Sequence, residues 1–425
     1  MRQDIYDAFF QTAITPDVSV QADVRHKELH QGDLRLNMFK LPFFDQNYDP
    51  FYRREVRGER YRGGMRYKPA ANATLLGSAI FQDETFEFGT LTALNKRTRD
   101  YNLEAQYQVQ SVYADFNLGV GHYEAKDNIF VADGAQDTRR TNGYFYSLLH
   151  LPKAITLTLG TSFDSFENPE VSSQLQFNPK AGLLWEIQPG TTFRLGMTRG
   201  LNWARNEMPT IEPTQVAGFN QVFTDPSGTR FWRYGIGLDH KFSERLCSGV
   251  EASLRELRVP FLEKDNFEPW REQMYRAYLN WAIDDQFAIS LNYNFEKFET
   301  DFEDESALLL AFFPTTVTHA ASVSLRYFHR SGFFAQLDPI LISQSATGFQ
   351  FEDNREIIKD ERFALVDASI GYRLPQRYGI IKLQVRNVFD KDFEYQSDWF
   401  RTTQRESSPP FYPARTIMGQ VLLSF

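Results

Sequence analysis

The sequence predicts an all-β protein, a transmembrane antiparallel up-and-down β-barrel of about 18 strands, an even number as in bacterial outer-membrane barrels. Three observations support this prediction. Apolar and polar residues alternate over stretches longer than the five or six residues usual in soluble strands. Short turns and longer loops follow one another along the 425 residues. No apolar run approaches the roughly 18 residues that a membrane-spanning helix needs.

The alternation is clearest in QFAISLNYNFEKFE (286–299). Its apolar positions are Phe287, Ile289, Leu291, Tyr293 and Phe295, and its polar positions are Ser290, Asn292, Asn294 and Glu296. The same pattern recurs, in chain order, at 60–68, 101–109, 155–163, 231–242, 274–283, 363–374 and 416–425. A soluble sandwich has no reason to expose aromatic residues along one face of every strand, and no propeller-like repeat is present. A barrel in lipid does, because its backbone pairs within the sheet while its outer face meets hydrocarbon.

The connections between these segments differ in length. Short turns rich in Pro, Gly, Asn and Asp occur at 69–74, 109–112, 151–155, 188–192, 243–246, 284–287, 329–333 and 374–379. Longer segments lie between them at 29–54, 126–138, 205–227, 263–270, 303–312, 351–357 and 397–411, with briefer ones near 89–97 and 168–172. The short turns are expected at the periplasmic end, the long loops outside and both termini in the periplasm. Residues 1–16 are expected to be a linker or the remainder of an upstream periplasmic domain, and residues 17–425 the barrel.

Composition excludes several classes of protein. The net charge of −9 argues against a nucleic-acid partner. The single cysteine, Cys247, excludes a disulfide framework and a multi-cysteine metal site. The pair His26 and His30 in HKELH has metal-binding spacing only on a helix, and the sequence contains no nucleophile-elbow, P-loop or dinucleotide fingerprint. We therefore expect no enzymatic activity, no catalytic residue, no metal and no cofactor.

The last 48 residues carry a more specific signal. GIIKLQVRNVFDKDFEYQ (379–396) precedes a loop and then YPARTIMGQVLLSF (412–425). This couplet resembles the last two strands of the TonB-dependent receptor family, in the residues Asn387, Val388, Phe389, Asp390, Lys391, Phe393, Pro413, Arg415, Thr416 and the terminal Phe425. Asn387 and Asp390 suit a strand that gives way to a loop, since such side chains bond local backbone, and Arg415 suits an anchor for the closing strand.

The resemblance implies a C-terminal strand ending on an aromatic residue, which the outer-membrane barrel assembly machinery reads as an address. The family also has about 22 strands and a plug inside the barrel, reached from a TonB-box peptide. Residues 1–16 contain neither a plug nor a TonB box, so the resemblance covers the barrel alone. A plug or a periplasmic domain upstream of residue 1 is a possible partner.

The polar face of the strands is expected to line the lumen. Candidate lumen residues are Arg62, Arg66, Arg194, Arg233, Asp239, Glu251, Arg255, Arg276, Asn292, Asn294, Glu296, Arg326, Asp367, Arg373, Lys382 and Arg386. Their mild basic excess would concentrate anions, or the charges could form Arg–Glu networks that stiffen the wall. Gly182, Gly196 and Gly235 on this face could relieve crowding or bend strands. The aromatic stretches 41–52, 308–316 and 397–412 could stack on a ligand or fold back into the barrel mouth.

These observations together predict a barrel, in contact with lipid, in the outer membrane of a Gram-negative bacterium. Its expected function is to move a solute or polymer across that membrane, as TonB-dependent receptors do. The alternatives are a polymer-export pore fused to a periplasmic scaffold, and a structural or adhesive barrel with a loop-sealed lumen.

Overall fold

The computed structural model describes residues 2–33, 36–39, 50–89, 94–129, 135–168, 171–203, 209–223, 225–260, 266–300, 315–350, 355–397 and 411–423. These ranges are almost entirely β-strand, with one short 3₁₀ turn, η1 (Pro375–Arg377). Across the described residues, we find no helix with the length and apolar character to cross a membrane.

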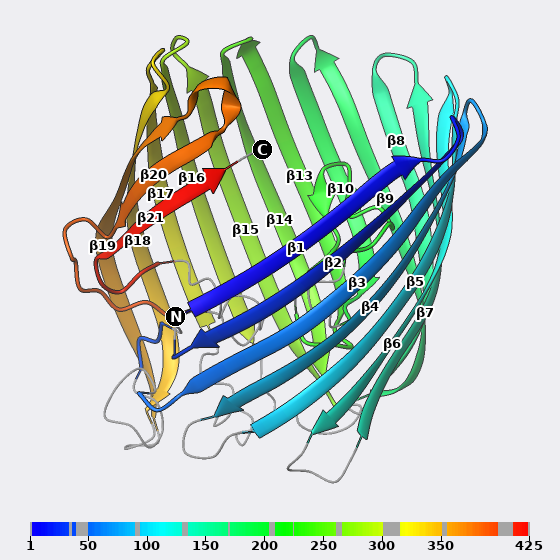
Figure 1. Cartoon of the computed structure of the whole chain (residues 1–425), viewed down its shortest axis with the longest axis horizontal. Coiled ribbons are helices and arrows are strands. Elements are labelled where there is room, and N and C mark those ends of the chain that lie inside the picture. Colours follow the sequence, from blue (N-terminus) through cyan, green and yellow to red (C-terminus); the bar gives the residue numbers. More distant parts are fainter. Residues whose placement is uncertain are drawn as a thin grey trace.

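One antiparallel sheet of 19 strands forms the wall (Figure 1). Each strand pairs with the next along the chain, and the order passes from β10 directly to β13. The first ten strands are β1 (Arg2–Ala13), β2 (Val18–Gln31), β3 (Arg53–Ala70), β4 (Ala73–Gly89), β5 (Leu94–Gln110), β6 (Ala114–Ile129), β7 (Ala135–Leu151), β8 (Ile155–Asn168), β9 (Val171–Gln188) and β10 (Thr191–Leu201). The others are β13 (Arg230–Ser243), β14 (Leu246–Pro260), β15 (Phe267–Ala282), β16 (Phe287–Thr300), β17 (Thr315–Phe328), β18 (Phe333–Gln350), β19 (Arg355–Arg373), β20 (Gly379–Arg386) and β21 (Thr416–Leu423). A separate hairpin consists of β11 (Gln215–Val216) and β12 (Phe219–Asn220).

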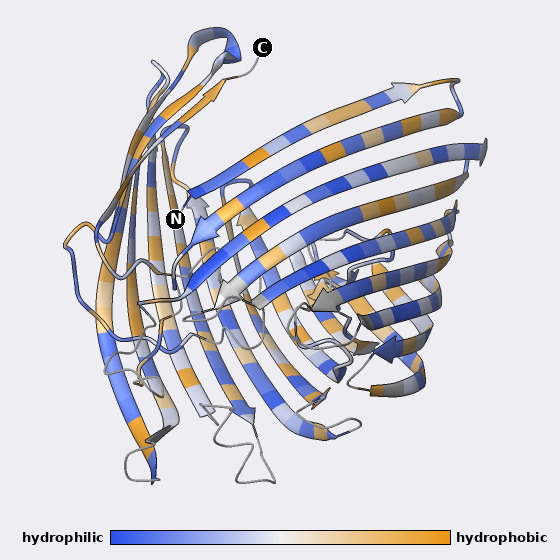
Figure 2. Ribbon diagram, turned by 60° about the horizontal axis from the view of Figure 1, so that its bottom comes forward, coloured by the Kyte–Doolittle hydropathy of each residue, from blue (hydrophilic) through white to orange (hydrophobic). Residues whose placement is uncertain are grey.

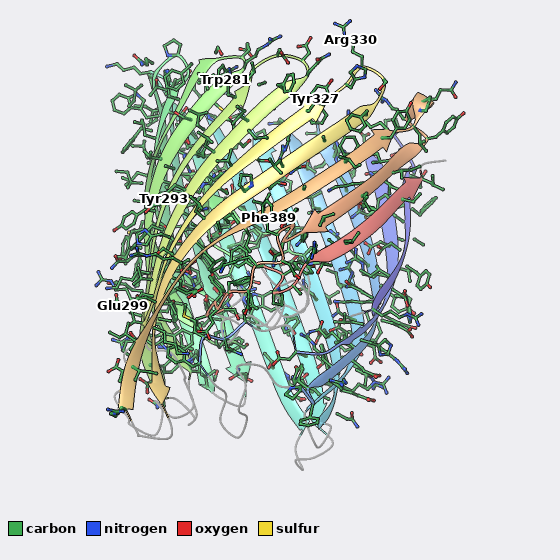
Figure 3. All side chains as sticks on the ribbon, turned by 90° about the vertical axis from the view of Figure 1, so that its left-hand side faces the viewer. Trp281, Tyr293, Glu299, Tyr327, Arg330 and Phe389 are labelled. Carbon is green, nitrogen blue, oxygen red and sulfur yellow. The ribbon has the colours of Figure 1, made fainter. Side chains whose placement is uncertain are left out.

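Hydrophilic and hydrophobic residues alternate along the strands (Figure 2). Because successive side chains of a strand point to opposite faces, the sheet has one apolar and one polar face. Phe287, Leu291 and Tyr293 of β16 lie on the outer face and are 41–46% exposed. Trp281 and Tyr293 project outward in Figure 3. Such a belt of exposed apolar and aromatic side chains is expected of a wall that faces hydrocarbon.

The outer face changes character toward the long loops. Tyr61, Phe81 and Tyr101 form one row of adjacent rings across β3, β4 and β5. Two positions further toward the loops, Asp83 accepts hydrogen bonds from Arg97 at 2.6 Å and 2.8 Å. The apolar belt therefore ends below the long loops, and charged side chains begin there.

Successive connections lie at opposite ends of the sheet (Figure 1), and the longer ones share one end, although the β8–β9 connection at that end, 169–170, is as short as a turn. The turn between β15 and β16 is typical of the short ones. The Asp284 carboxylate accepts backbone N–H groups of Gln286 and Phe287 at 2.7 Å and 2.8 Å, and these bonds lower the pKa of Asp284. A local cap of this kind fixes a tight hairpin.

Two expectations about the first residues are wrong. Arg2–Ala13 is not a linker but strand β1, paired with β2 over its whole length, and it accounts for the nineteenth strand. Since β1 runs toward the short turn at 14–17, Arg2 lies at the long-loop end, whereas Leu423 of β21 lies at the short-turn end. The two ends of the described chain therefore lie at opposite ends of the barrel, because an odd number of strands separates them.

The described strands leave one seam in the wall. β1 pairs with β2 and β21 pairs with β20, and no pairing joins β1 to β21 within the described residues. The sheet is thus curved like a barrel but has two strand edges.

The assignment of the two faces predicts a labelling pattern. A single cysteine at position 292 or 294 should react with a membrane-impermeant maleimide, because both positions belong to the inner face. Cysteines at 291 and 293 should be protected by lipid. The measurement is the labelling rate in intact membranes, with the native Cys247 replaced by Ser; reversed rates would invert the two faces.

Candidate functional site

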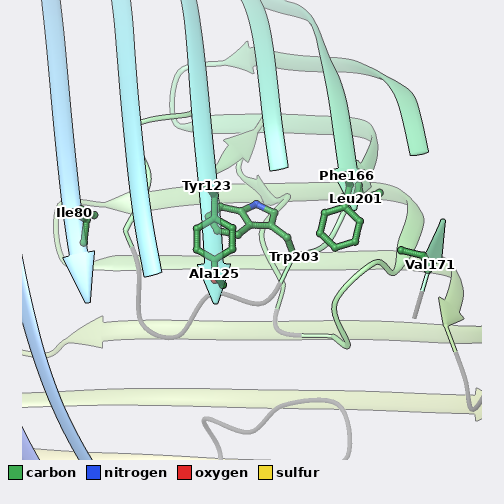
Figure 4. Close-up of a cluster of buried hydrophobic side chains, with 7 residues drawn as sticks. All are labelled: Ile80, Tyr123, Ala125, Phe166, Val171, Leu201 and Trp203. Carbon is green, nitrogen blue, oxygen red and sulfur yellow. The ribbon is translucent and has the colours of Figure 1, made fainter. Parts of the chain in front are cut away.

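The connection between β10 and β13 folds back along the inner face of the wall. Its described residues are 202–203, 209–223 and 225–229, here called the inner segment. At its start, Trp203 is buried, and its ring centroid lies 4.4 Å from that of Tyr123 on β6 (Figure 4). The Arg140 guanidinium lies over the same indole at 5.0 Å. The connection begins and ends at the long-loop end of the sheet, as the sequence predicted, but the inward fold of its described residues was not predicted.

The central feature of the inner segment is the Glu212 carboxylate. Tyr146 of β7 donates a hydrogen bond to it at 3.0 Å, and Asn142 of the same strand donates one at 3.2 Å. Lys180 of β9 and Arg140 of β7 form ion pairs with it at 3.6 Å and 3.7 Å. The Arg140 and Lys180 side chains are only 6% and 4% exposed. Four donors from the wall therefore converge on one carboxylate, in surroundings where removing one partner of an ion pair costs about 3–5 kcal/mol.

The wall also holds the backbone of the inner segment. Gln106 of β5 donates to the carbonyl oxygen of Ile211 at 2.7 Å, and the Glu104 carboxylate accepts the Ile211 N–H at 2.9 Å. On the opposite flank, Arg233 of β13 donates to the carbonyl oxygen of Asn220 at 2.6 Å. These bonds satisfy backbone groups that strand pairing leaves open.

A second set of charges fixes the end of the segment. Arg255 of β14 pairs with Asp225 of the segment and, at 2.7 Å, with Glu272 of β15. Its guanidinium lies 3.6 Å from the centroid of the Phe223 ring. Arg255, a lumen candidate from the sequence, therefore joins the wall to the segment rather than facing open water.

Glycines on the inner face make room for the β11–β12 hairpin. A Cβ atom at Gly182 would lie 2.7 Å from Cγ1 of Val216, and one at Gly235 would overlap the Phe219 ring. The hairpin turn itself has left-handed residues at Ala217 and Gly218, with φ of 49° and 83°. Such a two-residue turn matches the twist of a tight hairpin. Of the two roles considered for these glycines, relief of crowding is the one the geometry fits.

A second group of residues covers the inner face of β17, β18 and β19. Phe393 and Phe363 stack with centroids 4.4 Å apart, and Phe411 packs edge-on against Phe363. Met38 donates its N–H to the Gln396 side chain at 3.1 Å. Phe411 belongs to an aromatic stretch for which both ligand stacking and inward folding were considered, and the described part folds inward. Residues 41–49 and 308–314 of the other two aromatic stretches lie outside the described residues.

The strand register places every lumen candidate on the inner face, opposite the exposed apolar belt. Some are neutralised there: Arg194 donates to Asp239 at 2.6 Å and to Glu251 at 3.0 Å. Within the described ranges, the following make no ion pair with a carboxylate: Arg62, Arg66, Arg276, Arg326, Arg373, Lys382 and Arg386. The inner face thus combines paired charges beneath the inner segment with unneutralised cations elsewhere.

Sequence reasoning missed Glu212 and Asp225, because a polar loop bound to the wall has the same composition as a solvated one. It also missed Arg140 and Tyr146, although their strand alternates.

No cluster of three or more metal-binding side chains occurs in the described ranges.

The sequence matches no protein-family model and no curated protein. Solved structures with a similar fold do exist. FpvA of P. aeruginosa, described bound to pyoverdines, superposes with a TM-score of 0.67 at 11% identity, over 99% of this chain and 64% of its own length. The FrpB iron transporter of Neisseria meningitidis superposes with a TM-score of 0.74 at 10% identity, over 99% of this chain and 71% of its own length. The siderophore receptor PiuA of Acinetobacter baumannii superposes with a TM-score of 0.68 at 11% identity, over 99% of this chain and 74% of its own length.

The fold is that of a TonB-dependent receptor barrel. The chain spans about two thirds of the length of FpvA, at 64%. At identities of 10–13% the likeness concerns the fold.

The residues that carried the receptor resemblance take up structural positions. Asn387 is buried with φ of 49°; its side chain donates to the carbonyl oxygen of Lys391 and accepts the Lys391 N–H, both at 2.9 Å. Asp390 accepts the Arg415 N–H at 2.8 Å, which ties the start of β21 to the end of β20. Phe389 is 75% exposed, and Phe425 lies outside the described residues.

The geometry around Asn387 predicts a loss of stability on substitution. Asn387→Ala removes both local hydrogen bonds and places a residue without a polar side chain in the left-handed region, at a cost of about 1–3 kcal/mol. The measurement is the urea midpoint of the refolded protein in detergent. Asp392→Ala, at an exposed neighbour, is the control and should leave the midpoint unchanged; equal midpoints for all three proteins would contradict the structural role.

Proposed function

We propose that this chain is the barrel of a Gram-negative outer-membrane transporter that takes up an anionic solute. The observation that carries the proposal is the division of the sheet into an apolar outer face and a charged inner face. A curved wall of this kind separates hydrocarbon on its outer side from water on its inner side and provides a polar path along the inner face.

Uptake as the direction is supported by the fold. The solved structures with this barrel include an iron transporter and a siderophore receptor, as their descriptions state. An anionic solute is supported by the inner-face cations without a carboxylate partner, such as Arg276, Arg326 and Arg373. Basic groups on a confined wall raise the local concentration of anions.

The inner segment supports a narrowed lumen rather than a wide export pore. A polymer would need a continuous opening, whereas the segment contacts the inner face of β5, β6, β7, β9, β10, β13 and β14. This favours a small solute over a polysaccharide.

The proposal is tested by ion selectivity in planar bilayers. The purified protein should prefer anions under a salt gradient, and the triple variant R276Q/R326Q/R373Q should lose that preference. Arg271→Gln, on the outer face, is the matched control and should not change the reversal potential. If the native protein passes little current, the same reversal potential is measured on a variant that lacks residues 210–222. A preference for cations in both the native protein and this variant would reject an anionic solute.

A further inference from the structure

We infer that the wall pocket around Glu212 is an anion-binding site of the lumen, which the chain's own carboxylate occupies until a carboxylate of the solute replaces it. The inference rests on the proposed function only in taking the solute to be anionic. It assigns a ligand chemistry, a carboxylate, and a location, the inner face of β7 and β9.

The first step is the composition of the pocket. Arg140, Lys180, Tyr146 and Asn142 all direct donor groups at the Glu212 oxygens. Charge-assisted hydrogen bonds and ion pairs of this kind are made with the carboxylate oxygens, so another carboxylate that reaches the pocket can accept them.

The second step is the charge balance. Asp164 neutralises one of the two cations: Arg140 donates to it from Nε at 2.6 Å. Lys180 instead donates to the Ser162 hydroxyl at 2.9 Å. When Glu212 leaves, two buried cations share a single carboxylate, and such a buried charge is costly without a replacement anion. Departure of the segment is therefore coupled to the arrival of another anion.

Apart from Glu212, the stretch 209–222 is held to the wall by contacts that water can replace, whereas the Arg255–Asp225 ion pair keeps the end of the segment in place. Its backbone bonds with Gln106, Glu104 and Arg233 can be exchanged for water, and the β11–β12 hairpin rests on glycines without a covalent tie. Val216 at the hairpin tip is 1% exposed and clusters with Tyr144 and Tyr146. Its accessibility therefore reports whether the segment lies on the wall.

The experiment measures the labelling of Val216→Cys by a membrane-impermeant maleimide, in a Cys247→Ser background reconstituted in vesicles. Labelling of this parent should be slow. Glutarate, which carries the carboxylate of a glutamate side chain, should accelerate it, whereas the neutral glutaramide should not.

Three variants distinguish carboxylate binding at this site from a general loosening of the inner segment. Glu212→Gln should label roughly tenfold faster or more without any ligand, because charge-assisted hydrogen bonds are lost. Lys180→Gln should remove the response to glutarate, and Tyr146→Phe should weaken it, which keeps the test available if Lys180→Gln does not fold. Glu256→Gln, on the outer face of β14, is the matched control and should behave like the parent.

Equal effects of glutarate and glutaramide, or slow labelling of Glu212→Gln, would overturn the inference. A response to glutarate in a barrel that shows no anion preference in bilayers would uphold the site and reject the proposed function. The two failures are therefore distinguishable.

Discussion

Replacing residues 210–222 with a short Gly-Ser linker should raise the single-channel conductance of the protein several-fold. These residues include Glu212 and the β11–β12 hairpin, and their backbone carbonyl groups accept the hydrogen bonds from Gln106 and Arg233. A wall of 16 to 18 strands or more encloses an aqueous channel unless something fills it. The inner segment fills part of the lumen here, so its removal should widen the path.

The measurement is conductance in planar bilayers at fixed salt, with folding checked by heat-modifiable mobility on a gel. Asp225→Ala, which leaves Glu212 and the hairpin in place, is a useful comparison because it removes the carboxylate that pairs with Arg255. An unchanged conductance after loss of residues 210–222 would show that the segment does not limit the path.

Leu291→Arg should prevent stable insertion of the barrel or lower its folding free energy by about 2–4 kcal/mol, the cost of a cation on the lipid face near the bilayer midplane. Leu291 lies in the middle of β16, on the outer face, and is 41% exposed. Hydrocarbon offers an arginine no hydrogen-bond partner at that depth.

Asn292→Arg is the matched control, since the neighbouring position belongs to the lumen face and meets water. The measurement is the unfolded fraction against urea concentration after folding into vesicles of defined lipid. If both variants fold equally well, the outer face of β16 is not in contact with lipid.

The strands could be predicted because period-two alternation is imposed by the two environments of the wall. Strand β1 was not predicted, because Phe9 and Phe10 are adjacent in the sequence. Its apolar residues therefore fall on both faces of the strand, and the alternation is lost. The set of residues that face the lumen also follows from alternation. The alternation alone places Arg233 and Glu251 on the inner face, whichever residues they contact there.

The inner segment could not be predicted in this way. A loop that folds inward keeps the polar composition of a solvated loop, because the wall that receives it is polar as well. The available signal was on the wall: glycines at Gly182, Gly196 and Gly235 fall on neighbouring strands at facing positions. Such a patch without side chains indicates that another chain segment lies against it.

The two free strand edges have a geometric consequence. In an antiparallel series the first and nineteenth members, β1 and β21, point the same way. If they met directly they would form a single parallel ladder in an otherwise antiparallel cylinder. In hydrocarbon each amide or carbonyl group left unpaired along these two edges costs several kcal/mol, so the edges of β1 and β21 are the part of the described wall least suited to contact with lipid tails.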